Sequence, residues 1–375
     1  MKTKTIALFF AAMSATGCLT TANACTDFRL TAKDGTILVT RSMEFATDLQ
    51  SHLRTSTRDR VFTTTINAKP GLSWKATYGY LYLDGMGQDY AVDGMNEAGL
   101  SFEALYLPGY TQYQSMPATK ENLSLPYINI GDWILSNFKT IDEVKAALAK
   151  IYVVAQDLPG MGNIVFPLHY SVYDLSGKGI VIEYVNGNLS ISDNIGVMTN
   201  SPSYAWHTAN LTNYLNLSPY NPKPMVVDGV TYTSTGQGAG AVGLPGDTSP
   251  VSRFVRTAFS AANAYPVNNA VDLLNVAEHI INDVDIASGV SRTLSNGKES
   301  SDYTQWVVFK DLSNLKFYYR TYNNMTLQLV DLKQLDFSPN AKRLNMDIAG
   351  LPYAVNVTDK FKTSFINTNK TVAKK

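Results

Sequence analysis

Residues 22–43 read ANACTDFRLTAKDGTILVTRSM. Apolar and polar residues alternate on both sides of Asp34-Gly35, a dipeptide that favours a tight turn. The apolar members of this alternation are Phe28, Leu30, Ile37 and Val39. The pattern predicts a β-hairpin that has Cys25 at the head of its first strand.

The residues before Cys25 have the three parts of a secretory signal peptide. Lys2 and Lys4 give a positive start, residues 6–13 are apolar, and Ala22-Asn23-Ala24 is an A-x-A cleavage pattern. We therefore predict cleavage after Ala24 and export to the periplasm or the medium. The apolar run is too short to span a bilayer, and no later stretch approaches the ~18 apolar residues of a spanning helix, so no stable membrane span is predicted.

Cysteine usage supports this interpretation. The chain has two cysteines, Cys18 and Cys25. Cleavage after Ala24 would discard Cys18 and leave one thiol at the first position of the mature chain. A lone thiol is unusual in an oxidising compartment, which favours a reactive role for Cys25.

Two other interpretations of the cysteines remain open. In the first, Cys25 is an incidental terminal residue. In the second, Ala15-Thr16-Gly17-Cys18 is a lipoprotein cleavage site. The second interpretation places Ala15 where such sites usually have Leu, and it leaves Cys25 inside the chain.

A cysteine at the first position carries a nucleophile and a base on one residue. A free α-amino group has a reference pKa of about 7.7–8.0, so it can accept the thiol proton near neutral pH. The resulting thiolate can attack a carbonyl carbon, which is an established route to acyl transfer. This chemistry requires no metal and no organic cofactor.

Other catalytic motifs are missing from the sequence. There is no Gly-x-Ser-x-Gly and no His-Glu-x-x-His, and the glycine-rich residues 236–247 lack the Gly-Lys-Ser/Thr of a phosphate loop. The four histidines are scattered, and we interpret them as structural or exposed: His52, His169, His207 and His279.

Composition excludes some partners. The 375 residues include 31 basic and 31 acidic side chains, and this neutrality argues against nucleic acid as a ligand. The abundance of aromatic residues, with 22 Tyr and 15 Phe, is typical of a β-rich core and an apolar cleft.

The pattern along the chain predicts an α+β fold. Helices are expected at 130–150, 249–262 and 270–284. Hairpin signals lie at 78–92 and 99–107, and strands are expected at 169–174, 180–185, 189–192, 306–311, 316–321 and 326–331. Groups of strands flanked by helices indicate helices packed on sheets. No linker divides the mature chain, so we predict a signal peptide at 1–24 and a single catalytic domain at 25–375.

The opening of the mature chain, Cys25-Thr26-x-Phe28, Asp34-Gly35 and Arg41-x-x-Glu44, resembles that of the choloylglycine hydrolase family. This family includes bile salt hydrolases and penicillin V acylases. Three further blocks follow in the family's order. They are Asn96-Glu97-x-Gly99-Leu100 leading to Tyr106-x-Pro108-Gly109-Tyr110, then Thr199-Asn200-Ser201-Pro202, and then Gly243-Leu244-Pro245-Gly246-Asp247-x-Ser249-x-x-Ser252-Arg253-Phe254.

The resemblance implies a four-layer αββα N-terminal-nucleophile fold and assigns catalytic roles. Cys25 would be the nucleophile and, through its amine, the base. Arg41 would lie beside the thiol, where a cation favours the thiolate. The Asn200 side-chain amide would contribute to the oxyanion hole, and Arg253 would be the second arginine of the site.

Two positions differ within the family. Glu44 replaces the Asp that contacts the terminal amine in many members, which keeps the charge but changes the reach. Tyr106 stands where bile salt hydrolases tend to have Asn and penicillin V acylases tend to have Tyr. A phenol there would flatten the substrate cleft and favour aryl or linear acyl groups.

The sequence thus predicts a hydrolase of linear amide bonds that acts through a Cys25 thioester. Penicillin V, N-acyl homoserine lactones and conjugated bile salts are the candidate substrates, and the family implies a homotetramer. One alternative is an exported binding protein, lipid-anchored or free, that keeps the fold without turnover. Another is a peptidase or ceramidase-like hydrolase that uses the same kind of nucleophile.

Overall fold

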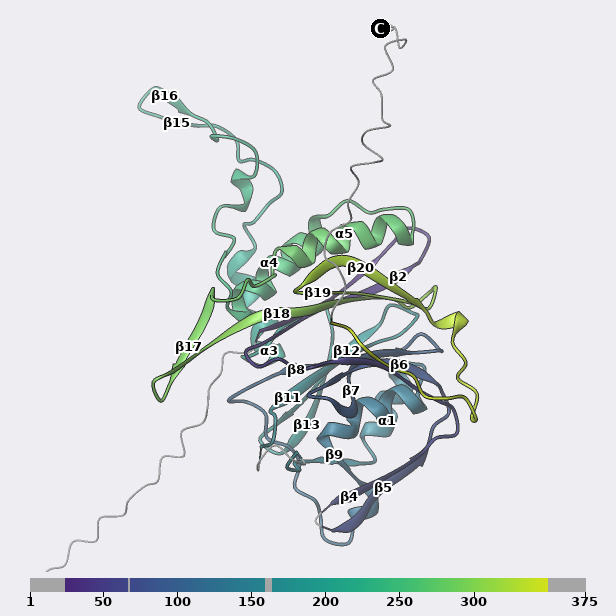
Figure 1. The fold of residues 1–375 in the computed structure, drawn as a ribbon. Coiled ribbons are helices and arrows are strands. Elements are labelled where there is room, and N and C mark those ends of the chain that lie inside the picture. Colours follow the sequence, from purple (N-terminus) through teal and green to yellow (C-terminus); the bar gives the residue numbers. More distant parts are fainter. Residues whose placement is uncertain (1–23, 67, 159–163, 350–375) are drawn as a thin grey trace, which may run out of the picture.

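The computed structural model describes residues 24–66, 68–158 and 164–349. Over these residues two β-sheets face each other, and helices cover the outer face of each sheet (Figure 1). The predicted αββα arrangement is therefore confirmed. The predicted signal peptide, apart from Ala24, lies outside the described residues, as does the chain after residue 349.

The first sheet contains the N-terminal hairpin. Its strands are β1 (Cys25–Thr31), β2 (Ile37–Phe45), β14 (Val197–Met198), β17 (Ser291–Ser295), β18 (Lys298–Asp311), β19 (Lys316–Thr321) and β20 (Asn324–Asp331). They pair in the order β14-β1-β2-β18-β19-β20, and β17 pairs with β18. The hairpin predicted on either side of Asp34-Gly35 is the β1–β2 pair, which lies near the middle of this sheet.

The second sheet is built from the middle of the chain. Its strands are β3 (His52–Ser56), β6 (Tyr80–Gly85), β7 (Gln88–Asn96), β8 (Ser101–Tyr106), β11 (Leu168–Tyr173), β12 (Gly179–Val185), β13 (Asn188–Asp193) and β21 (Asn345–Asp347). They pair in the order β13-β12-β11-β8-β7-β6-β3-β21. This order places β7 and β8 in the centre, opposite the first sheet.

The helices divide between the two outer faces. They are α1 (Ile130–Asn137), α2 (Ile141–Leu148), α3 (Tyr204–Asn210), α4 (Pro250–Asn263) and α5 (Ala270–Asn282). α4 and α5 pack on the first sheet, and α1 packs on β7 and β8 of the second. None of the helices in the described ranges is long and apolar enough to cross a bilayer.

The predicted single helix over 130–150 is wrong. The chain leaves the helix at Phe138, whose backbone is extended, and α2 starts only after Thr140. The Thr140 side chain accepts a hydrogen bond from the Glu143 N–H, and the Glu143 carboxylate accepts one from the Thr140 N–H. This capping box begins a new helix, which apolar spacing alone did not indicate.

Three short ladders were not predicted. They are β4 (Val61–Ile66) with β5 (Lys69–Lys75), β9 (Ser124–Pro126) with β10 (Tyr152–Val154), and β15 (Met225–Val227) with β16 (Val230–Tyr232). The β15–β16 hairpin projects away from the layers as an arm (Figure 1). Strand β18 also begins earlier than expected, since its polar first half pairs with β17.

Two apolar clusters hold the layers together. One joins the first sheet to α4 and α5 and to the facing side of the second sheet, and it includes Cys25. The other lies between the second sheet and α1 and α2. Cys25 therefore sits inside the packed interior, at the head of a central strand.

Candidate active site

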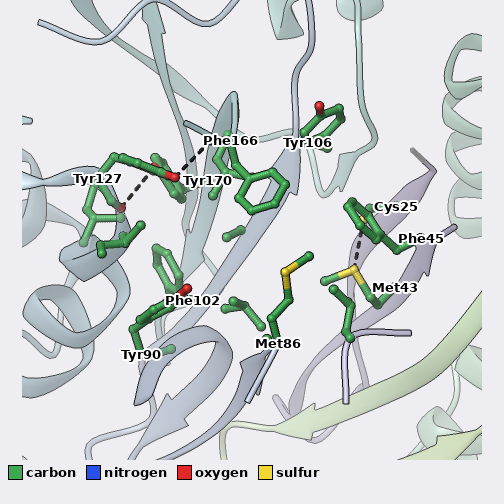
Figure 2. Close-up of a pocket in the computed structure, with 18 of the residues that line it drawn as sticks. Cys25, Met43, Phe45, Met86, Tyr90, Phe102, Tyr106, Tyr127, Phe166 and Tyr170 are labelled. Carbon is green, nitrogen blue, oxygen red and sulfur yellow. Dashed lines mark hydrogen bonds between the residues drawn. The ribbon is translucent and has the colours of Figure 1, made fainter. Parts of the chain in front are cut away.

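The thiol of Cys25 is buried and points between the two sheets. In the β1–β2 hairpin Cys25 is opposite Met43, and Asp27 is opposite Arg41. Because side chains on a strand alternate between faces, these four share the face that meets the second sheet. The Sγ of Cys25 lies 3.7 Å from the Sδ of Met43, as the dashed line in Figure 2 marks.

Arg41 lies beside this thiol, as the resemblance implies. Its Nη2 is 3.8 Å from Sγ of Cys25, and its Nη1 is 3.2 Å from Oδ2 of Asp93. Nη1 and Nη2 also donate to the backbone carbonyls of Val92 and Ala104, respectively. Burial opposes the charge of Arg41, but the interactions with Cys25 and Asp93 outweigh burial and raise the pKa of Arg41. A fixed cation therefore faces the sulfur.

Asn200 lies beside the backbone nitrogen of Cys25. That nitrogen donates to Oδ1 of Asn200 at 2.6 Å, and Nδ2 of Asn200 donates to the Tyr106 carbonyl at 2.9 Å. An amide nitrogen has two hydrogens, so one donor position is used by Tyr106 and the second is what an oxyanion would need. The oxygen of the side chain, which the sequence did not single out, is the atom that accepts from the Cys25 nitrogen.

Arg253 reaches the same place from the first turns of α4. Its Nη1 lies 2.5 Å from the Cys25 carbonyl oxygen and its Nη2 lies 2.7 Å from Oδ1 of Asn200. The helix starts at Ser249, whose hydroxyl accepts from the Ser252 N–H, and Pro250 follows. Burial lowers the pKa of Arg253. Arg253 thus ties the head of β1 to the Asn200 loop.

Glu44 is buried close to the same backbone but on the neighbouring strand. Its N–H donates to the Ala24 carbonyl at 2.9 Å, and its Oε1 accepts from the Thr304 hydroxyl at 2.8 Å. Oε2 has no hydrogen-bond partner among the described residues. Burial raises the pKa of Glu44 to about 7. An unpaired carboxyl oxygen is thus available near the residue that precedes Cys25.

An apolar cavity borders Cys25 and is lined by residues from both sheets. Its lining is almost entirely aliphatic and aromatic. Besides Cys25, the residues that line it include Met43, Phe45, Leu49, Met86, Tyr90, Phe102, Tyr106, Tyr127, Ile130, Phe166, Leu168 and Tyr170. In Figure 2, Cys25, Met43, Phe45 and Tyr106 lie at one end of the cavity and Tyr90, Phe102, Tyr127 and Tyr170 at the other, with Met86 and Phe166 between them. The cavity suits an apolar acyl group attached at the sulfur.

Tyr106 belongs to the outer part of this cavity, as expected. Its ring packs edge-on against Phe45 and Phe166, with ring centres 6.4 Å away in both cases. Phe45 and Phe166 are themselves 6.2 Å apart. Three mutually packed rings thus form one side of the entrance, a feature that separate positions in the sequence could not reveal.

Two of the histidines support the Asn200 loop. The ring nitrogen Nε2 of His207 lies 2.8 Å from the Asn200 carbonyl oxygen, and Nε2 of His169 lies 2.9 Å from that of Thr199. Burial lowers the pKa of His207 to about 4, so the ring is neutral. Both act on backbone atoms, which agrees with a structural role. Among the described residues no cluster of His, Cys, Asp or Glu is arranged to hold a metal ion.

Comparison with known proteins gives the family. Residues 25–348 match the family of linear amide C–N hydrolases called the choloylglycine hydrolase family. The chain belongs to the choloylglycine hydrolase family. As a choloylglycine hydrolase family member it is an amidohydrolase of linear C–N bonds, which supports an enzyme rather than a binding protein that kept the fold.

Individual proteins similar to this chain support its assignment to the choloylglycine hydrolase family. The bile salt hydrolase/transferase of Clostridium perfringens is 36% identical over 323 residues, covering 84% of this chain and 94% of that protein. The penicillin V acylase of Pectobacterium atrosepticum is 27% identical over 328 residues, covering 80% of this chain and 78% of that protein. A solved structure of conjugated bile acid hydrolase from Clostridium perfringens has a TM-score of 0.78 at 31% identity, and covers 88% of this chain and 99% of that one.

Proposed function

We propose that the protein is an exported acylase that hydrolyses N-acyl amides with linear or aryl acyl groups, using Cys25 as its nucleophile. One observation carries the proposal. The sulfur of Cys25 lies at the entrance of an apolar cavity and 3.8 Å from the Arg41 guanidinium, while its backbone nitrogen is held by Asn200. Nucleophile, cation, amine acceptor and acyl pocket are thus in one place.

The geometry supports the following sequence of steps. Removal of residues 1–24 frees the Cys25 amine, which takes the thiol proton, and Arg41 stabilises the thiolate. The thiolate attacks the acyl carbon, and the second N–H of Asn200 with nearby backbone N–H groups stabilises the oxyanion. The protonated amine then gives its proton to the leaving nitrogen, and a thioester forms. Water activated by the same amine releases the acid and restores the thiol.

The cavity lining favours flexible or flat acyl groups. The lining presents mostly aromatic and aliphatic surface, which accommodates an alkyl chain or a phenyl ring and offers a buried hydroxyl few partners besides the phenols of its tyrosines. A hydroxylated sterol carries such groups and is also rigid. We therefore place penicillin V and N-acyl homoserine lactones ahead of conjugated bile salts as substrates, although the more similar relatives act on bile salts.

Turnover and intermediate can be tested together. Purified protein is incubated with penicillin V, an N-acyl homoserine lactone and a conjugated bile salt, and both acid release and protein mass are followed. We expect acid release and an added mass equal to the acyl group on the Cys25 peptide in rapidly quenched samples. Cys25→Ala should abolish both while leaving circular dichroism unchanged. Acid release by Cys25→Ala would refute the mechanism.

Export is a separate part of the proposal. The positive start, apolar run and A-x-A pattern support signal-peptide cleavage after Ala24. Terminal sequencing of the protein from the periplasm or medium should give Cys25 as the first residue. A chain that begins at lipidated Cys18, or that keeps any residue ahead of Cys25, would contradict it because the amine would be blocked.

Self-association, which the family implies as a homotetramer, is also a proposal. The β15–β16 arm exposes Met225, Val226, Val227, Val230 and Tyr232 to solvent, and exposed apolar patches of this kind mark interaction sites. Sedimentation of the purified protein should give a tetramer. Replacement of Val226 and Val230 by Ser should reduce the mass of the assembly. A monomeric wild-type protein would rule the proposal out.

A further inference from the structure

A line of buried charges leads away from Arg41 between the two sheets. The Nζ of Lys310 lies 2.6 Å from Oδ1 of Asp93 and 2.7 Å from Oε1 of Glu103, and all three side chains are fully buried. The other carboxylate oxygen of Asp93 is the one that contacts Arg41. Lys310 is thus linked to the Cys25 sulfur through Asp93 and Arg41.

The fold brings these three side chains together from distant positions. Asp93 and Glu103 are opposite each other on β7 and β8, and Lys310 reaches them from β18 in the facing sheet. Two adjacent carboxylates would oppose negative charge on the nearby sulfur. Burial disfavours the charged form of Lys310, but Asp93 and Glu103 outweigh burial and raise the pKa of Lys310. Lys310 is therefore a fixed cation that neutralises both.

The line ends in two carboxyl groups that are bridged by the hydroxyl of Ser171. The Oγ of Ser171 lies 2.7 Å from Oδ2 of Asp27 and 2.8 Å from Oε2 of Glu103. A hydroxyl donates only one proton, so the second contact requires a proton on one of the carboxyl groups. Burial, followed by the charge of Glu103, raises the pKa of Asp27 well above its ordinary value. Burial raises the pKa of Glu103 too, but the direct contact with Lys310 favours the charged form of Glu103, so the proton is assigned to Asp27.

With that proton in place the buried charges balance. Arg41 and Lys310 are positive, and Asp93 and Glu103 are negative. The titratable and charged groups that face this region are Cys25, Asp27, Arg41, Asp93, Glu103, Tyr173 and Lys310, with Glu44 and Arg253 on the other side of Cys25. A buried ion pair stabilises a fold little compared with well-packed apolar residues. A role in the reaction therefore explains these buried charges better than a contribution to the stability of the fold.

We propose that Asp93 and Lys310 are positioning residues for the Cys25 nucleophile: Lys310 neutralises and orients Asp93, and Asp93 holds the Arg41 guanidinium against the sulfur. The proposal rests on the proposed function of Cys25. It implies that the charges at positions 93 and 310, rather than the volume of the side chains, govern thiolate formation. Removing the two charges should therefore have opposite effects.

Alkylation of Cys25 measures this directly. The rate of its reaction with iodoacetamide is followed across pH by mass spectrometry of the processed protein, because only the thiolate reacts. Lys310→Met, which leaves excess negative charge, should move the midpoint upward by about one pH unit. Asp93→Asn should move it downward by a similar amount, because an amide oxygen can still accept from Arg41 while the negative charge is lost. Lys310→Arg, and Lys316→Met on the neighbouring strand, should keep the wild-type midpoint.

Kinetics supply a second readout. Both charge-removing variants should lower kcat about tenfold with little change in KM, because the groups act on the nucleophile and do not touch the substrate. Unchanged midpoints, shifts in the same direction for Lys310→Met and Asp93→Asn, or a Lys310→Arg protein as impaired as Lys310→Met would each overturn the proposal and assign the cluster to packing. If one charge-removing variant fails to fold, the sign of the shift in the other decides.

The test remains separate from the proposed function. Alkylation needs no substrate, so a wild-type protein that is alkylated at Cys25 but hydrolyses none of the amides would refute the proposed function alone. Opposite midpoint shifts would still establish the positioning role.

Discussion

The sulfur atoms of Cys25 and Met43 lie 3.7 Å apart, because the two residues are opposite each other on β1 and β2. The Nη2 of Arg41 is also 3.7 Å from the Met43 sulfur. Met43 therefore packs against both the nucleophile and its cation, and it is almost fully buried. A soft, polarisable side chain at this point keeps water away from the pair while contacting both members.

Shortening the side chain of Met43 should lower the stability of the fold. Met43→Ala should lower the free energy of unfolding by about 2–5 kcal/mol through the cavity it leaves, whereas Met43→Leu, which conserves volume, should cost less than about 1.5 kcal/mol. Urea denaturation of each variant measures this, with exposed Met325→Ala as the control. Equal losses for Ala and Leu would show that the sulfur, and not the volume, stabilises the site.

Substitution of Asn200 separates its two polar atoms. Asn200→Asp keeps the oxygen that accepts from Cys25 N and Arg253 but removes the amide N–H. If that N–H stabilises the oxyanion, kcat should fall about 10²–10³-fold while the fold is retained. Steady-state kinetics with the best amide substrate measure the effect, and Asn263→Asp at the exposed end of α4 is the control. A kcat close to wild type would remove Asn200 from the oxyanion hole.

Glu44 should make stability depend on pH in an unusual direction. Burial raises its pKa from an ordinary 4.5 to about 7 in the folded protein. Between these values the folded state keeps a proton that the unfolded state has lost, so stability is greatest below about pH 4.5 and falls as pH rises towards 7. The contribution amounts to at most about 3 kcal/mol. Denaturation midpoints from pH 4.5 to 8 measure it.

Glu44→Gln is the matched variant for that measurement. It should remove this part of the pH dependence, so that the variant gains stability relative to wild type as pH rises from 4.5 to 7. A variant whose pH profile runs parallel to that of the wild type would show that Glu44 does not titrate in this range.

Tyr106 should control which acyl groups enter. Tyr106→Asn removes one of the three packed rings at the entrance and introduces the residue that bile salt hydrolases tend to carry. The ratio of kcat/KM for a conjugated bile salt to kcat/KM for penicillin V should rise about tenfold or more, the size expected for pocket contacts. Tyr110→Asn, in the turn that follows β8 and exposed, should leave the ratio unchanged. No change in the Tyr106 variant would assign selectivity to deeper residues such as Phe102.

Much of the site could be predicted because local sequence carries its position. Alternation around Asp34-Gly35 placed Cys25 and Arg41 on one hairpin, and that register brings them to 3.8 Å. Asn200 and Arg253 came from the family resemblance alone, and both meet the Cys25 backbone. The helix over 130–150 was wrong because a capping box at Thr140 overrode the apolar spacing.

The sequence by itself determined the central hairpin with Cys25 at its head and the alternation of strand and helix groups, since each follows from a local pattern of apolar residues and turns. Tertiary structure decided the rest. Lys310 contacts Asp93 across 217 positions, and Phe166 reaches Tyr106 from the segment before β11. Such partners share no periodicity or spacing in the sequence. Only the packing of the two sheets face to face brings them together as a buried charge pair or as the lining of an apolar cavity.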